Sequence, residues 1–171
     1  AYGARISKGI WQTMANRMVS LGYAVPGAVL AVGILILLAQ LDIAWLLSGS
    51  IVILVYAYLT RFLSSGLQTV EAGLSKITPS MDASAMSLGS GKWEILRRIH
   101  LPLLRRSLLT AGLLVFVDVM KELPATLVLR PFNFDTLAVV TYQLAADERL
   151  AEAAWPALTI VFAGLIPVII L

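Results

Sequence analysis

Long uncharged runs alternate with shorter charged segments along this chain. No charged residue occurs between Met18 and Leu41, and the next run, from Ile43 to Thr60, is also uncharged. Arg61 marks the expected end of that second run. A helix needs about 20 predominantly apolar residues to cross a bilayer, so both runs predict membrane spans. The whole pattern predicts four spans, at residues 24–41, 43–62, 107–129 and 155–171.

Polar segments occupy the rest of the chain. Residues 1–20 carry an apolar side chain about every four positions, with three basic and no acidic residues between them. This spacing is typical of an amphipathic helix, which lies on the membrane surface or packs on its own bundle. We expect packing on the bundle. Residues 63–106 form a long charged connection, and residues 130–154 form a second polar segment.

The long connection contains a short helix–turn–helix between Asp82 and Pro102. Gly89-Ser90-Gly91 separates its two helical pieces, and Gly89 is expected to take the left-handed conformation common at helix ends. Ser80 is the expected cap of the first piece, because serine favours that position. Pro102 is expected to end the second piece, since proline restricts the residue before it. We expect the adjacent His100 to lie at the surface.

This helix–turn–helix resembles the EAA loop of ABC-importer permeases, which inserts into a groove on a cytoplasmic ATPase. The glycine and the I-x-L-P of that loop are present. The glutamate of Glu-Ala-Ala is replaced by Ala83, so Asp82 supplies the carboxylate of this region. An ordinary amphipathic helix on the membrane surface is the alternative interpretation. The resemblance implies the ATPase-coupling residues Asp82, Ala83, Ser84, Ala85, Gly89, Ile99, Leu101 and Pro102.

The resemblance extends along almost the whole chain. It is most specific in GYAVPG at 22–27, ITPSMDASAMSLG at 77–89 and KELPATLVLRPFNFDTLA at 121–138, which are similar to the ferric-iron branch of these importers. Permeases of that branch have two homologous halves, and this chain is similar to the second. It begins without methionine and stops inside an apolar run, so we expect it to be part of a longer protein.

The family resemblance implies a fold and a set of partners. The implied fold is all-α: a polytopic type I ABC-importer transmembrane domain with about four membrane helices and a cytoplasmic coupling helix–turn–helix. The implied partners are a dimer of cytoplasmic ABC ATPases, an extracytoplasmic substrate-binding protein, the first half of the same permease, and membrane lipid. The implied location is the bacterial inner membrane, with ATP hydrolysis on separate subunits.

Composition narrows the possible functions. Hydrophobic residues make up 59% of the chain and charged residues only 13%, against about 25% charged in soluble domains. The chain has no cysteine, and its single histidine is His100, so thiolate metal sites and histidine-based catalytic triads are excluded within it. It also lacks a phosphate-binding glycine loop. We therefore expect no catalytic residue, metal, cofactor or nucleic-acid partner, and no enzyme activity of its own.

The distribution of basic residues predicts the orientation. Three Lys or Arg residues lie in 1–20 and seven in 61–106, so these segments hold ten of the 13. Basic residues concentrate on the cytoplasmic side of membrane proteins. The N-terminus and the 63–106 connection are therefore expected in the cytoplasm, and 130–154 outside it.

The third predicted span contains charged residues. A charge at the bilayer centre costs about 2.5–3.5 kcal/mol on insertion scales, so Asp118, Lys121 and Glu122 are expected to face protein or water. Asp118 and Lys121 are three residues apart and can pair on one helix face, whereas Glu122 is expected to pair with another helix. Pro124 is expected to kink the helix beside them.

Two roles for these four residues remain open: an ion pair that locks helices together, or a lining of the translocation path. A metal site at the two carboxylates is disfavoured, because the ammonium group between them in sequence repels cations.

The combined prediction is a permease subunit of an ABC importer, with ferric iron as its substrate. Thiamine, phosphonate, sulfate and molybdate are alternative substrates, because the residues do not distinguish them chemically. A stand-alone secondary transporter or channel is a different alternative, disfavoured by the helix–turn–helix that resembles a partner-binding loop. A membrane-embedded enzyme is disfavoured by the absence of clustered catalytic residue types.

Overall fold

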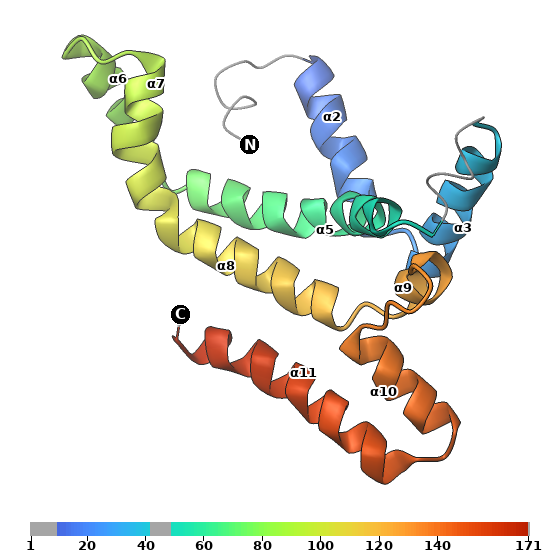
Figure 1. The fold of residues 1–171 in the computed structure, drawn as a ribbon. Helices are drawn as coiled ribbons and strands as arrows, with labels where there is room; N and C mark the ends of the chain where they lie inside the picture. The colour runs from blue at the N-terminus through green and yellow to red at the C-terminus, as the bar shows by residue number, and fades with distance from the viewer. Residues whose placement is uncertain (1–9, 42–48, 171) are drawn as a thin grey trace.

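The computed structural model describes residues 10–41 and 49–170, and every regular element in these ranges is helical, as predicted (Figure 1). The elements in chain order are α2 (Ile10–Leu21), α3 (Gly27–Ala39), α5 (Ile51–Leu74), α6 (Pro79–Ser87), α7 (Lys92–Ile95), the π-helical turn η1 (Leu96–His100), α8 (Leu101–Met120), α9 (Pro124–Leu129), α10 (Leu137–Ala146) and α11 (Leu150–Ile170).

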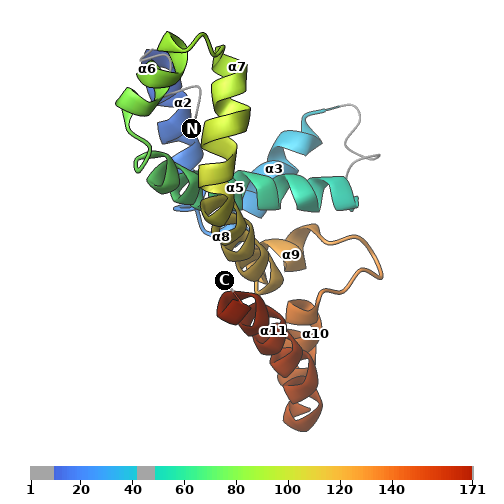
Figure 2. The same cartoon turned by 90° about the vertical axis from the view of Figure 1, so that its left-hand side faces the viewer.

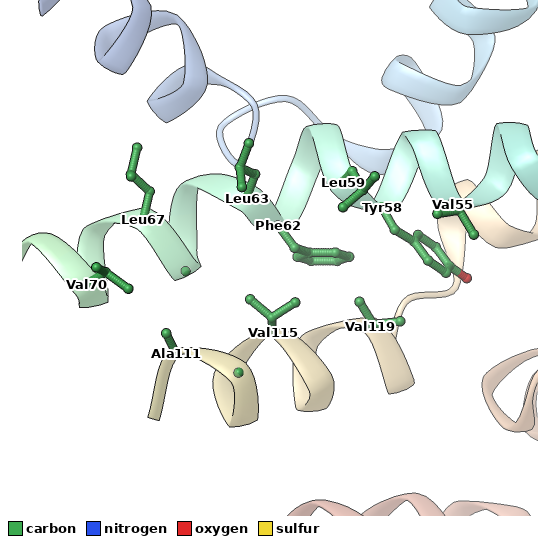
Figure 3. Close-up of a pocket in the computed structure, with 12 residues that line it drawn as sticks. Val55, Tyr58, Leu59, Phe62, Leu63, Leu67, Val70, Ala111, Val115 and Val119 are labelled. Carbon is green, nitrogen blue, oxygen red and sulfur yellow. The ribbon is translucent and has the colours of Figure 1, made fainter. Parts of the chain in front are cut away.

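Helices α5 and α8 lie side by side through the middle of the molecule (Figures 1 and 2). Phe62 and Tyr58 of α5 point toward α8, where Val115 and Val119 face them across an apolar groove of about 460 Å³ (Figure 3). At the other end of the pair, Leu74 and Leu104 belong to one small buried cluster. This helix pair is therefore the frame on which the other elements are placed.

The remaining elements extend from the two ends of this frame. Helices α6 and α7 project from one end, while the turn between α10 and α11 lies at the opposite end in both views (Figures 1 and 2). Helix α11 contacts α8 on the side away from α5. Helix α3 packs on α9 and α5, where a buried apolar core contains Ala31, Ile34, Ile53, Leu54, Ala57, Ala125 and Leu129.

Several helix boundaries differ from the predicted spans. Helix α5 does not end near Arg61 but continues to Leu74, and the charge of Arg61 is paired within the protein. The single helix expected over 107–129 is two helices, since α8 ends at Met120 and α9 begins at Pro124, which has no N–H for a continuing helix. Part of the expected second span, residues 42–48, lies outside the described residues.

Only α5 has both the length and the apolar composition to cross a membrane, among the residues that the structure describes. Three further apolar helices are shorter: Gly27–Ala39, Leu137–Ala146 and Leu150–Ile166. The third of these occupies most of α11, which begins before the expected span at 155–171.

The expected packing of the N-terminal amphipathic helix on its own bundle is seen only in part, among the residues that the structure describes. Ile10, Met14 and Met18 of α2 are exposed, although the helix contacts α5. The contact is made near the C-terminal end of α2, where Gly22 approaches the backbone of Thr60. The apolar stripe of α2 therefore faces away from its own bundle. The first nine residues of the predicted helix lie outside the described residues.

Candidate functional site

The helix–turn–helix is present, and its turn has the predicted glycine geometry. Gly89 has a φ of 86°, in the left-handed region that glycine adopts most easily. The N–H of Ser90 donates to the carbonyl of Ala85 over 3.1 Å, which closes the end of α6. The expected cap at Ser80 is wrong: α6 begins at Pro79, whose fixed φ suits a first helical position, and Thr78 precedes it.

The second piece does not end at Pro102, contrary to the sequence prediction. Helices α7 and α8 are joined through η1, so one helical rod runs from Lys92 to Met120. The N–H of Leu101 donates to the carbonyl of Leu96, five residues back. This wider turn lies directly before Pro102, and the rod therefore continues past a residue that has no N–H to donate.

His100 is completely buried rather than at the surface. Its Nε2 lies 2.6 Å from Oδ1 of Asp82, so the histidine of η1 is hydrogen-bonded to the first turn of α6. A buried polar side chain is costly unless it has such a partner. Sequence spacing carries no signal for this contact, because the two residues are on different helices.

The eight predicted coupling residues divide by exposure. Ala85 is buried and Asp82 and Ile99 are half-buried, whereas the others are exposed: Ala83, Ser84, Gly89, Leu101 and Pro102. Sequence reasoning did not include the apolar side chains beside the turn among the coupling residues. Leu88 is 87% exposed, and Met86 and Trp93 are also exposed. The helix–turn–helix of α6 and α7 is called the hairpin below. Its outer end therefore presents exposed apolar side chains around α6, whose own residues are mostly small.

Glu122 lies at the centre of a buried polar cluster. It is 5% exposed, and its Oε1 accepts hydrogen bonds from Nη1 of Arg61 over 2.9 Å and from the N–H of Ala125 over 3.1 Å. The prediction that Glu122 pairs with another helix is confirmed, because Arg61 belongs to α5. Sequence reasoning did not identify Arg61 as the partner. The second bond holds the first turn of α9 against the same carboxylate.

The surrounding residues leave little space at this ion pair. A Cβ atom on Gly27, at the start of α3, would lie 1.9 Å from Nη1 of Arg61 and 2.6 Å from Oε1 of Glu122. The hydroxyl of Thr126 donates to the carbonyl of Glu122 over 2.8 Å and is 2.5 Å from the hydroxyl of Tyr58. The cluster therefore joins α3, α5 and α9 at one point.

Asp118 and Lys121 form a separate pair. Their Oδ1 and Nζ atoms are 2.9 Å apart, which confirms the predicted i,i+3 contact. The Lys121 side chain is 62% exposed and lines a hollow of about 340 Å³ between α8 and α11. Pro124, at the start of α9, follows the helix break rather than a kink within one helix. The charges treated together in sequence thus occupy two different environments.

These carboxylates already have cationic partners. Glu122 is paired with Arg61, and Asp118 with Lys121. Within residues 10–41 and 49–170, no three His, Asp or Glu side chains come together in a way that suits a metal ion.

Comparison with known proteins places this chain in a family. The family model of binding-protein-dependent transport system inner membrane components matches residues 1–171. An Fe(3+)-transport system permease protein of Haemophilus influenzae, FbpB 2, is 30% identical over 156 residues, covering 91% of this chain and 30% of the relative. A protein of Salmonella typhimurium named as a 2-aminoethylphosphonate transport system permease, PhnV, is 30% identical over 164 residues, covering 96% of this chain and 58% of the relative.

A third relative, the ferric transport system permease protein FbpB of Actinobacillus pleuropneumoniae, is 28% identical over 131 residues, which are 77% of this chain and 17% of that protein. The chain thus spans less than two thirds of each of these relatives. The family match nevertheless covers all of it, and the chain belongs to the family of binding-protein-dependent transport system inner membrane components.

Proposed function

We propose that this chain is a membrane-spanning unit of an ABC importer and that the α6–α7 hairpin docks on a cytoplasmic ATPase dimer. The hairpin carries the proposal, because Leu88, Met86 and Trp93 expose apolar side chains beside the small residues of α6. Exposed apolar patches of this kind are typical of protein–protein contacts. ATP hydrolysis then belongs to the ATPase subunits, and this chain converts their movement into opening of a path.

Ferric iron is the proposed substrate. Two of the relatives described above are named as ferric transport permeases, and their similarity supports iron. PhnV, the relative named for 2-aminoethylphosphonate, is also 30% identical to this chain. We therefore take 2-aminoethylphosphonate as the second candidate substrate. Within the chain, Asp118, Lys121 and the break before Pro124 are the proposed lining of the path, because the exposed Lys121 reaches the hollow beside α11.

The opposite end of the molecule is the proposed docking surface for a substrate-binding protein. The loop after α9 is closed by an ion pair between Arg130 and Asp135, and it displays Phe132 with 93% of its surface exposed. This loop and the α10–α11 turn lie away from the hairpin (Figure 2). The proposal places them outside the cytoplasm of a bacterial inner membrane, and it places the N-terminus and the hairpin inside.

The docking role predicts that Gly89→Ser weakens capture of the ATPase. Space is available for the new side chain. A residue with a Cβ is nevertheless destabilised by about 1–2 kcal/mol in this left-handed backbone conformation. Gly91→Ser is the matched control, because Gly91 has a φ of −72° and serine is a favoured helix cap. The measurement is the amount of ATPase that co-purifies with the full-length permease. Equal capture by the two variants and the wild type would contradict docking through this turn.

The proposed orientation predicts the labelling of introduced cysteines. Ser87→Cys in α6 and Asp147→Cys after α10 are both exposed positions, and the chain contains no other cysteine. In intact cells, an impermeant thiol reagent should label Asp147→Cys and not Ser87→Cys, while both should react after the cells are opened. Labelling of both variants in intact cells would refute the orientation.

A further inference from the structure

We propose that His100 is the positioning residue through which movement of α6 is passed to α8, by means of its hydrogen bond to Asp82. The proposal rests on the docking of α6 to the ATPase described above. It adds a residue outside the eight coupling positions. The bond is 2.6 Å long, and the histidine side chain is completely buried.

The location of the bond within the hairpin suggests this role. Helix α6 is tied to α7 at its C-terminal end by the Gly89 turn, where Ser90 donates to Ala85. The Asp82–His100 bond is in the first turn of α6, about one turn before Ala85. Contacts at two successive turns of a short helix restrict its rotation about either one. A force applied to the exposed face of α6 is therefore transferred to the helix that carries His100.

The helix that carries His100 continues to the proposed path. The rod that begins at Lys92 runs through η1 and α8 to Met120, next to the Asp118–Lys121 pair. His100 is the last residue of the π-helical turn, and Pro102 follows two residues later. Helices bend most easily at π turns and prolines, because regular i to i−4 bonds are missing there. The Asp82 contact is thus made at the part of the rod that bends most easily.

This role predicts a loss of coupling rather than a loss of assembly. Asp82→Ala removes the hydrogen-bond partner of His100, and His100→Leu replaces the imidazole by an apolar side chain that fills part of the same space. Both variants keep the turn at Gly89 and the exposed apolar side chains beside it. Substrate uptake should fall in both variants. His100→Leu, whose position is buried and lies outside the eight coupling positions, should bind the ATPase and hydrolyse ATP as the wild type does.

The test is the number of ATP molecules hydrolysed per ferric ion taken up, measured with the full permease, its ATPase and its binding protein in liposomes. The ratio should rise about fivefold or more in both variants, which is the lower end of typical coupling between linked sites. Asp82→Asn keeps an acceptor for the histidine and should stay near the wild-type ratio. Glu94→Ala is the matched control, because it breaks only an exposed ion pair with Arg98 on the same hairpin.

An unchanged ratio in Asp82→Ala and His100→Leu would overturn the proposal. If these variants give too little folded protein, the double variant Asp82→Asn with His100→Gln decides, since it retains hydrogen-bonding side chains at both positions. A wild-type ratio supports the proposal, and a raised ratio at normal yield contradicts it. Failure of the wild-type permease to bind an ATPase would instead refute the proposed function. Absence of iron uptake by the wild type would refute the substrate, and 2-aminoethylphosphonate then replaces iron in the same assay.

Discussion

Replacing Glu122 by leucine is expected to prevent stable folding of this chain. The substitution leaves the guanidinium of Arg61 without its carboxylate in a largely buried position, and Ala125 loses an acceptor. Removal of one partner of a buried ion pair costs about 3–5 kcal/mol, which is a large part of the stability of a typical domain. The measurement is the yield of monodisperse protein in detergent together with its thermal unfolding temperature.

The double variant Arg61→Leu with Glu122→Leu should recover most of that loss, because no uncompensated charge remains. It should not recover all of it, since the N–H of Ala125 stays without its acceptor at a cost of about 1–3 kcal/mol. Glu152→Leu is the matched control: this carboxylate pairs with Arg149 at an exposed site, where water and salt screen an ion pair and its contribution to stability is small. Wild-type stability of Glu122→Leu would show that the Arg61–Glu122 pair does not lock these helices.

The opposite result is expected for the second ion pair, where transport rather than folding should be lost. Asp118→Asn breaks this pair and leaves only the charge of Lys121, whose side chain is 62% exposed, so it leaves no charge in a dry interior. Lys121→Met leaves the carboxylate of Asp118, whose side chain is 14% exposed, so Asp118→Asn is the variant that should keep normal folding. Uptake per folded transporter should fall by about tenfold or more, the effect of raising the barrier to transport by roughly 1.4 kcal/mol. Uptake and unfolding temperature are measured on the same preparations.

The double variant of Asp118 and Lys121 distinguishes a path lining from a structural pair. A structural pair replaced at both positions should regain uptake, whereas residues that line the path should not. Met120→Leu serves as the control, because it lines the same hollow without carrying a charge. Full uptake by the double variant would refute the proposed path at this position.

The predictions for Glu122 and for the Asp118–Lys121 pair differ because the two ion pairs lie in different environments. Sequence spacing did not indicate this difference. The sequence places Asp118, Lys121 and Glu122 within five positions of one predicted span. The helix break before Pro124 turns Glu122 toward α5 and leaves Lys121 beside α11. A local pattern predicts which side chains share a helix face only while the helix continues.

The sequence by itself determined the features that depend on neighbouring residues. The all-helical class, the hairpin, the left-handed Gly89 and the Asp118–Lys121 contact all follow from backbone preferences and spacing within one turn or helix. Such features require only helical periodicity and the conformational freedom of glycine, so they are visible before any packing is known.

Only the tertiary structure decided which distant side chains meet. It paired Arg61 with Glu122, and it buried His100 against Asp82 although the sequence favoured a surface position. Burial and charge compensation depend on how helices cross, and one-dimensional spacing contains no measure of that geometry.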